Sequence, residues 1–197
     1  MKNNKKTSSK KSKYKFLVLF AFLLLLIVSE KLSAQIADPS PLTFPNPGKI
    51  ENMLFYLQRD PNINTLIYAV NTNKAGDINK EKPISIYWVR YTEKGEKREL
   101  GYIQRKFAYG LNTKELSKNK FELRFASYKY LPLYLSQTNS ENKYQVTVTV
   151  NGKTILISRL FVRIEGGSFW LPNVKYALVE GIELATGKNV TEKIAIK

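Results

Sequence analysis

The sequence predicts an all-β protein, an antiparallel β-sandwich of about nine to eleven strands, with a closed β-barrel as the alternative. Two observations support this prediction. From residue 50 onward, runs rich in Val, Ile, Thr, Tyr and Phe recur about every 8–15 residues with turn residues between them, which is typical of short strands. One of these runs, 144–150, alternates apolar and polar residues throughout, as a strand with one buried face does.

Three pairs of runs predict β-hairpins. In chain order they are 84–91 with 100–109 across the turn 93–96, 144–150 with 153–164 across Asn151-Gly152, and 174–184 with 189–196 across the turn 185–188. Asn-Gly is the strongest of these turn signals, because both central residues of a type I′ turn need a positive φ. The shorter runs 52–58, 64–70, 120–127 and 131–136 predict further strands. The one helical turn that we expect lies near 113–118.

The N-terminal residues have the pattern of a secretory signal peptide. Residues 1–15 hold seven Lys and no acidic residue, residues 16–28 form an unbroken apolar run, and small residues follow at Ser33 and Ala34. We therefore expect cleavage after Ala34 and export to the periplasm or the exterior. An uncleaved membrane anchor is the alternative, although the 13 apolar residues fall short of the roughly 20 that a transmembrane helix needs.

The exported chain is then expected to have two parts. Residues 35–49 contain four of the eight Pro, which favours an extended leader that lies along the domain, is mobile, or docks a partner. Residues 50–197 form a single β-domain. Removal of residues 1–34 lowers the formal charge from +16 to +9. The chain has no Cys, which excludes a lipid anchor on a thiol and all disulfides, and we expect no stable membrane span after cleavage.

The composition also excludes several kinds of catalysis. Without His or Cys, the chain cannot build a Ser-His-Asp triad, a cysteine nucleophile or a His/Cys zinc site. A carboxylate-based hydrolase needs two carboxyls at one cleft, and the candidates are Asp60, Asp77, Glu165, Glu180 and Glu183. We expect no cofactor and no metal, because the loop 71–77 has too few acidic residues to bind calcium.

Basic and aromatic residues alternate in several segments, a composition that nucleic-acid or polyanion sites share. The basic pairs Lys97-Arg98 and Arg105-Lys106 are examples. These charges are spread along the chain rather than gathered in one run, and export separates the protein from nucleic acid. We therefore predict a solvated basic surface and no nucleic-acid partner.

An aromatic segment is the clearest sign of a binding site. Phe169-Trp170 lie between Gly166-Gly167 and Pro172, in what should be a connection between strands. Loops at one end of a β scaffold often carry binding residues, and Trp can stack on a sugar ring or anchor a protein partner. The alternative is that both rings fold back and plug the open end of the core.

Alternation along 100–109 would place Arg105 and Tyr109 on one face of a strand. An Arg on an apolar face needs either a carboxylate partner or a ligand. The same two interpretations hold for Arg90, which shares a strand face with Trp88.

Four stretches resemble a family of exported bacterial proteins described as domain of unknown function 4833. They are Ile-Tyr-Trp-Val-Arg-Tyr around Trp88, Gln-Arg-Lys-Phe-Ala-Tyr-Gly at 104–110, Glu-Gly-Gly-Ser-Phe-Trp-Leu-Pro-Asn-Val at 165–174, and Thr-Gly-Lys-Asn-Val-Thr-Glu-Lys-Ile at 186–194. The resemblance covers about residues 50–195. It implies an exported bacterial domain, but no activity and no functional residue.

The leading hypothesis is a non-enzymatic binding protein of the bacterial envelope or exterior, whose ligand or protein partner is unknown. The expected ligand contacts are Trp88, Arg105, Tyr109, Glu165 and Trp170. The alternatives are a carboxylate-based hydrolase that acts on envelope glycans and a structural subunit of an envelope assembly. The structural role predicts an exposed apolar patch or an unpaired edge strand instead of a pocket.

Overall fold

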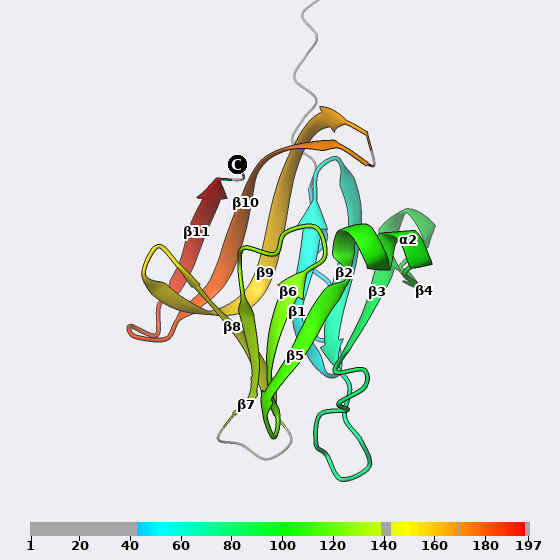
Figure 1. The fold of residues 1–197 in the computed structure, drawn as a ribbon. Helices are drawn as coiled ribbons and strands as arrows, with labels where there is room; N and C mark the ends of the chain where they lie inside the picture. The colour runs from blue at the N-terminus through cyan, green and yellow to red at the C-terminus, as the bar shows by residue number, and fades with distance from the viewer. Residues whose placement is uncertain (1–42, 139–142, 169, 196–197) are drawn as a thin grey trace, which may run out of the picture. The chain divides into compact units, whose positions relative to one another are not determined.

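A computed structural model describes residues 43–138, 143–168 and 170–195 (Figure 1). Within these ranges the chain forms eleven strands, which confirms the all-β class. The strands are β1 (Met53–Arg59), β2 (Asn62–Val70), β3 (Ile84–Arg90), β4 (Glu96–Glu99), β5 (Leu111–Ser117), β6 (Lys120–Phe125), β7 (Leu133–Gln137), β8 (Tyr144–Val150), β9 (Lys153–Gly167), β10 (Pro172–Glu183) and β11 (Asn189–Ala195). The short helices are η2 (Tyr91–Glu93), α2 (Tyr102–Gln104) and η3 (Arg105–Tyr109). The predicted signal peptide, residues 35–42 of the leader and Phe169 lie outside the described residues.

All eleven strands belong to one hydrogen-bonded sheet, in which β9 is the branch point. β10 pairs with β9 along almost its whole length, so β10 occupies one edge of that strand. The other edge is shared, because β8 pairs with residues 153–156 and β1 pairs with residues 159–162. Two arms therefore diverge from β9, one in the order β1-β2-β3-β4 and the other in the order β8-β7-β6-β5.

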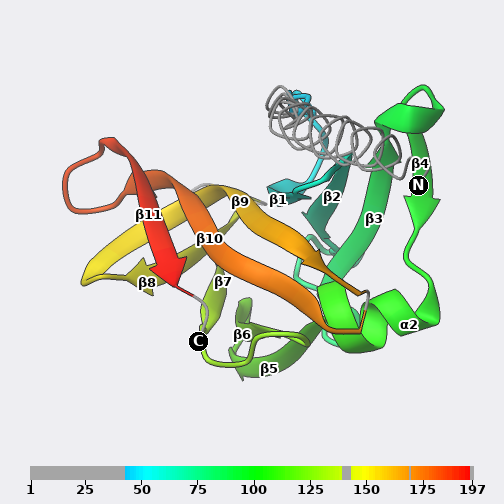
Figure 2. The ribbon, with the colours of Figure 1, turned by 90° about the horizontal axis from the view of Figure 1, so that it is seen from above.

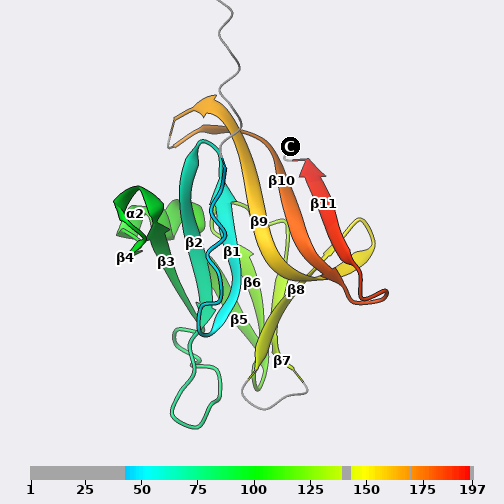
Figure 3. The ribbon, with the colours of Figure 1, turned by 180° about the vertical axis from the view of Figure 1, so that it is seen from behind.

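The two arms curl toward each other into an open half-barrel. Figure 3 shows β3, β2, β1, β9, β10 and β11 side by side, with β5 to β7 behind them. Figure 2 shows the same arrangement from above, with β5 and β6 across from β10. The predicted sandwich and its alternative, a closed barrel, both stay predictions. One strand pair departs from the expected antiparallel arrangement, because β1 and β9 run parallel.

Two of the predicted hairpins form, and turn chemistry explains the first. Asn151 and Gly152 both have positive φ, 51° and 79°, as the type I′ turn between β8 and β9 requires. β10 and β11 pair antiparallel around the predicted turn at 185–188. The four shorter runs correspond to β1, β2, β6 and β7, with bounds shifted by up to two residues.

Two predicted elements are wrong. β4 ends at Glu99, and residues 102–109, expected as a strand, form the short helix α2–η3. Gly110 closes this helix, because a Cβ there would lie 1.9 Å from the carbonyl oxygen of Arg105. Residues 113–118, expected as a helical turn, belong instead to β5 and the turn that follows it. Pairing of β5 with the half-buried strand β6 outweighs the local helix propensity of this segment.

The core lies between the two arms. It contains Phe55, Leu66 and Tyr68 from the β1–β2 side and apolar residues of β6, β7 and β8 from the other side. The Phe55 and Tyr68 rings stack with centroids 4.5 Å apart, and Phe125 meets Tyr68 edge-on at 5.7 Å. This aromatic series connects the interior to the place where Tyr109 and the β6–β7 loop meet.

The described part of the leader, 43–49, contacts the domain. The Phe44 ring meets Phe161 edge-on at 5.1 Å, and the Gln58 side-chain amide donates to the Pro45 carbonyl over 2.7 Å. This part of the leader therefore lies along β1 and β9. In the described part of the chain, no helix is long and apolar enough to span a membrane.

Candidate functional site

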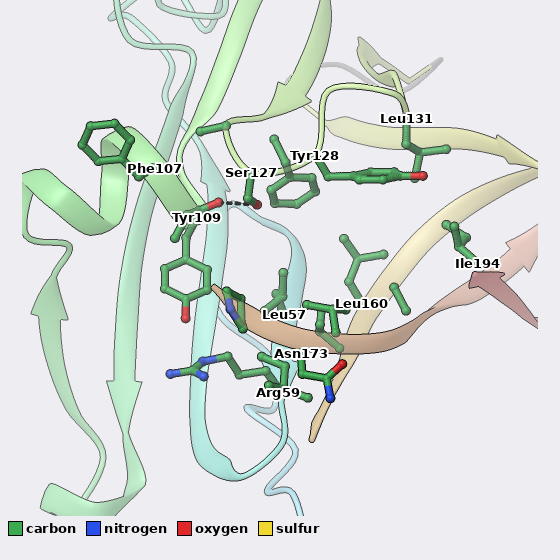
Figure 4. Close-up of a pocket in the computed structure, with 18 of the residues that line it drawn as sticks. Leu57, Arg59, Phe107, Tyr109, Ser127, Tyr128, Leu131, Leu160, Asn173 and Ile194 are labelled. Atoms are coloured by element: carbon green, nitrogen blue, oxygen red, sulfur yellow. Dashed lines mark hydrogen bonds between the residues drawn. The ribbon is translucent and has the colours of Figure 1, made fainter. Parts of the chain in front are cut away.

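An open apolar groove of about 720 Å³ lies on the inner side of the half-barrel (Figure 4). Its floor comes from β1, β9, β10 and β11, and its opposite wall comes from the end of η3 and the segment that follows β6. The volume is in the range of pockets that hold small organic ligands. Most side chains around the groove are aliphatic or aromatic, and no Asp or Glu is among its described lining residues.

Strand register explains why the floor is continuous. Leu57 on β1 pairs with Leu160 on β9, which in turn pairs with Val179 on β10. Directly paired residues project from the same face of a sheet, so the three apolar side chains adjoin across three strands. The next positions repeat the arrangement, since Val162 pairs with Ala177.

Two hydrogen bonds connect the opposite wall to the short helix and to Gly110, which follows it. The Ala126 N–H donates to the Gly110 carbonyl over 2.8 Å, and the Ser127 hydroxyl donates to the Ala108 carbonyl over 2.7 Å. Tyr128 and Leu131 complete this wall. The segment that follows β6 is therefore held against the end of the short helix, and together they face the floor of the groove.

Two exposed aromatic side chains flank the mouth of the groove. Trp170, in the β9–β10 connection, meets Phe107 of η3 edge-on with ring centroids 6.0 Å apart. Trp170 is 66% exposed and Phe107 is 50% exposed. Trp170 therefore does not plug the core, and its ring is accessible to a ligand that enters the groove. The described structure does not include Phe169.

Tyr109 is held from three sides. Its ring meets Trp88 edge-on at 5.4 Å, and its carbonyl accepts a 2.9 Å hydrogen bond from the Tyr68 hydroxyl. Arg59 places its guanidinium carbon 5.8 Å from the centroid of the Tyr109 ring. Burial raises the pKa of the Tyr109 hydroxyl above its ordinary value of 10.0, and the nearby Arg59 charge partly offsets this rise. The hydroxyl is therefore protonated at neutral pH and can donate a hydrogen bond.

Arg59 is the one charged residue among the described groove lining, and it is not among the contacts that the sequence predicts. Phe55, Leu57 and Arg59 alternate along β1, and the first two are buried in the core. The Arg59 Nε is buried without a hydrogen-bond partner among the described residues. The alternation Phe55-x-Leu57-x-Arg59 was the signal that could have identified this cation.

The acidic groups near the groove have other cations as partners. Asp60 accepts a hydrogen bond from Arg163, and Glu165 contacts Arg163 and Lys175 at 3.2 and 3.9 Å. Glu180 pairs with Arg159 at 2.6 Å on the opposite face of the sheet from the groove. These carboxylates are therefore engaged away from Arg59.

The structure brings together only part of the predicted site. Tyr109 and Trp170 line the groove. Trp88 is buried behind Tyr109, and its indole N–H donates to Gln104 over 3.4 Å. Arg105 lies on the short helix and is 3.6 Å from Glu99, while Glu165 lies outside the groove lining. Arg90 pairs with Glu93 at 2.7 Å, so both of these Arg have the carboxylate partner that one interpretation required.

The hydrolase alternative requires two carboxyls that face one cleft. Asp60 and Glu165 share the cation Arg163, but neither borders the groove. Asp77 pairs with Lys118 and Asn119, and Glu183 accepts from the Thr186 hydroxyl over 2.7 Å. No cluster of three or more potential metal-binding side chains occurs in the part of the chain that the structure describes.

Comparisons with known proteins identify one family. A family model described as "Domain of unknown function (DUF4833)" matches residues 55–193, which include the whole groove except Ile194. Neither the curated proteins nor the solved structures contain a match to the chain.

Proposed function

The chain belongs to the DUF4833 family, and we propose that it is a non-enzymatic ligand-binding protein of the bacterial envelope or exterior. The observation that carries the proposal is the open apolar groove of about 720 Å³ with Phe107 and Trp170 at its mouth. An apolar pocket with a few convergent polar groups is the usual form of a small-molecule site. The placement of the nearby carboxylates outside the groove also favours binding over hydrolysis.

Export is part of the proposal and rests on the N-terminal sequence. The basic residues 1–15, the apolar run 16–28 and Ala34 together support secretion and cleavage. N-terminal sequencing of the protein from an extracytoplasmic fraction should give Gln35 as the first residue. Full-length protein in the cytoplasm would contradict this part of the proposal without affecting the groove.

Binding is tested with a neutral apolar fluorophore, N-phenyl-1-naphthylamine, whose emission rises when it leaves water. We expect saturable binding to the purified protein. The variant Ala177→Phe should weaken it by about tenfold or more, because the ring would occupy the groove floor. The matched control Ala185→Phe adds the same ring to an exposed turn and should leave binding unchanged.

Thermal unfolding separates a blocked groove from a damaged fold. Ala177→Phe should unfold at nearly the wild-type temperature, because the ring enters open space instead of a filled core. Val174→Trp, nearer the mouth, provides a second obstruction if the first variant does not fold. Unchanged binding in a folded Ala177→Phe protein would show that the groove is not the site.

A further inference from the structure

We propose that the ligand of the groove is a single-chain amphipathic carboxylate, such as a fatty acid, whose head group is bound by Arg59 and Tyr109. The inference rests on the proposed function and specifies the ligand class for the same site. Figure 4 shows Arg59 and Tyr109 toward one end, and Leu131, Ile194 and the Tyr128 ring toward the other, so the groove has one charged end and a second end that is mostly apolar apart from the Tyr128 hydroxyl.

The charge of the polar end favours an anion. Arg59 contributes a positive charge to the groove, and the described lining contains no carboxylate to balance it. Asp60, its neighbour in sequence, pairs with Arg163 instead. The buried Nε of Arg59 has no hydrogen-bond partner among the described residues. A ligand with one negative charge would neutralise the guanidinium.

The chemistry of the donors favours a carboxylate. A guanidinium offers two parallel N–H groups that match the two oxygens of a carboxylate. The protonated Tyr109 hydroxyl adds a third donor beside the Arg59 guanidinium, whose position over the Tyr109 ring restrains both groups. A doubly charged phosphate would meet only one cation here, so a singly charged head group matches the site better.

The remainder of the groove suits an alkyl chain. Val162, Val174, Ala177 and Ile194 form a partly exposed apolar floor beneath Tyr128 and Leu131, and the buried residues Leu57, Leu160 and Val179 support it. This surface offers contact to an apolar ligand and few hydrogen bonds. Each methylene buried there should tighten binding about fourfold, which corresponds to the usual transfer free energy of a methylene group. Phe107 and Trp170 are positioned where the ligand meets solvent.

The test is competition against the neutral naphthylamine probe at pH 7. Dodecanoate should displace the probe at about one tenth of the concentration that dodecanol requires, because only the acid can pair with Arg59. Decanoate should displace it about 16-fold less well than dodecanoate, from two methylenes at about fourfold each. Equal displacement by dodecanoate and dodecanol would overturn the inference.

Variants identify the head-group site. In Arg59→Met, which keeps an unbranched apolar side chain, the preference for dodecanoate over dodecanol should fall to about twofold or less. The control Arg98→Met removes an exposed charge from β4, outside the groove, and should keep the preference. A preference that survives in Arg59→Met would overturn the assignment. Failure of the wild type to bind the neutral probe would overturn the proposed function itself.

Discussion

Arg59 and Arg159 provide a direct test of the idea that one of them serves binding and the other serves folding. Both lie where β1 and β9 pair, but on opposite faces of the sheet. Arg159 donates from Nε to Gln58 over 2.8 Å and from Nη1 to Glu180 over 2.6 Å. Arg59 has a buried Nε without a partner among the described residues. Replacing each by Met should therefore change stability in opposite directions.

The expected stability change for Arg59→Met follows from two opposing contributions. A buried donor without an acceptor costs about 1–3 kcal/mol. The cation–π contact with Tyr109, at 5.8 Å, contributes about 0.5–1 kcal/mol in the other direction. Met preserves most of the contacts of the aliphatic stem. The free energy of unfolding of the ligand-free protein should therefore rise by about 1 kcal/mol, which raises the melting temperature by about 2–4 °C.

Arg159→Met should instead lower the free energy of unfolding by about 3 kcal/mol. The change leaves the side-chain oxygen of Gln58, a residue only 2% exposed, and the half-buried Glu180 without their donor. Urea denaturation, followed by circular dichroism, measures both changes as shifts of the midpoint at constant slope. Similar destabilisation by both substitutions would refute the reasoning, because it would mean that folding also depends on the Arg59 charge.

Three further predictions concern the mouth, the helix end and an ion pair. Trp170→Ala should change the free energy of unfolding by less than about 0.5 kcal/mol, since the side chain is 66% exposed, yet weaken probe binding by about tenfold in a fluorescence titration. Gly110→Ala should destabilise the protein by about 2–4 kcal/mol in urea, because the new Cβ would meet the Arg105 carbonyl at 1.9 Å. Hydrogen bonds from Lys153 and Asn151 lower the pKa of Glu192 below its ordinary value of 4.5. The stabilisation from this lowered pKa is present above pH 4.5 and disappears as the pH falls through the folded-state value, so Glu192→Gln should show a shallower loss of melting temperature on acidification.

The parts of the fold that local chemistry determines could be predicted from the sequence. Asn151-Gly152 needs no distant partner to favour its turn, and the alternation of β8 records which face is buried. Residues 102–109 could not be assigned in the same way. Their helix depends on the contact of Gly110 with the Arg105 carbonyl and on a hydrogen bond from Tyr68, 41 residues away in the chain.

The candidate site, too, could be predicted only in part from the sequence. Trp170 was identified because the Gly and Pro residues around it mark a connection between strands, and the structure exposes it at the mouth. Arg59 was missed because the expected strand ended at residue 58, although β1 extends through Arg59. Arg59 is notable because the described structure gives it no carboxylate partner. The nearby carboxylates pair elsewhere through long-range contacts, Asp60 with Arg163 and Glu180 with Arg159.

The groove itself follows from the way in which β9 is shared. Because β8 and β1 pair with successive segments of the same edge of β9, the two arms separate where the pairing changes, between residues 156 and 159. Beyond that point, among the described residues, the short segments that contain Tyr109 and Tyr128 face the inner side of β9 and β10. A packed core would place an apolar side chain at the end of this face, but the chain has Arg59 there. Residues that break a local folding rule are characteristic of functional sites. Among the described groove residues, Arg59 is the one for which a ligand explains more than folding does.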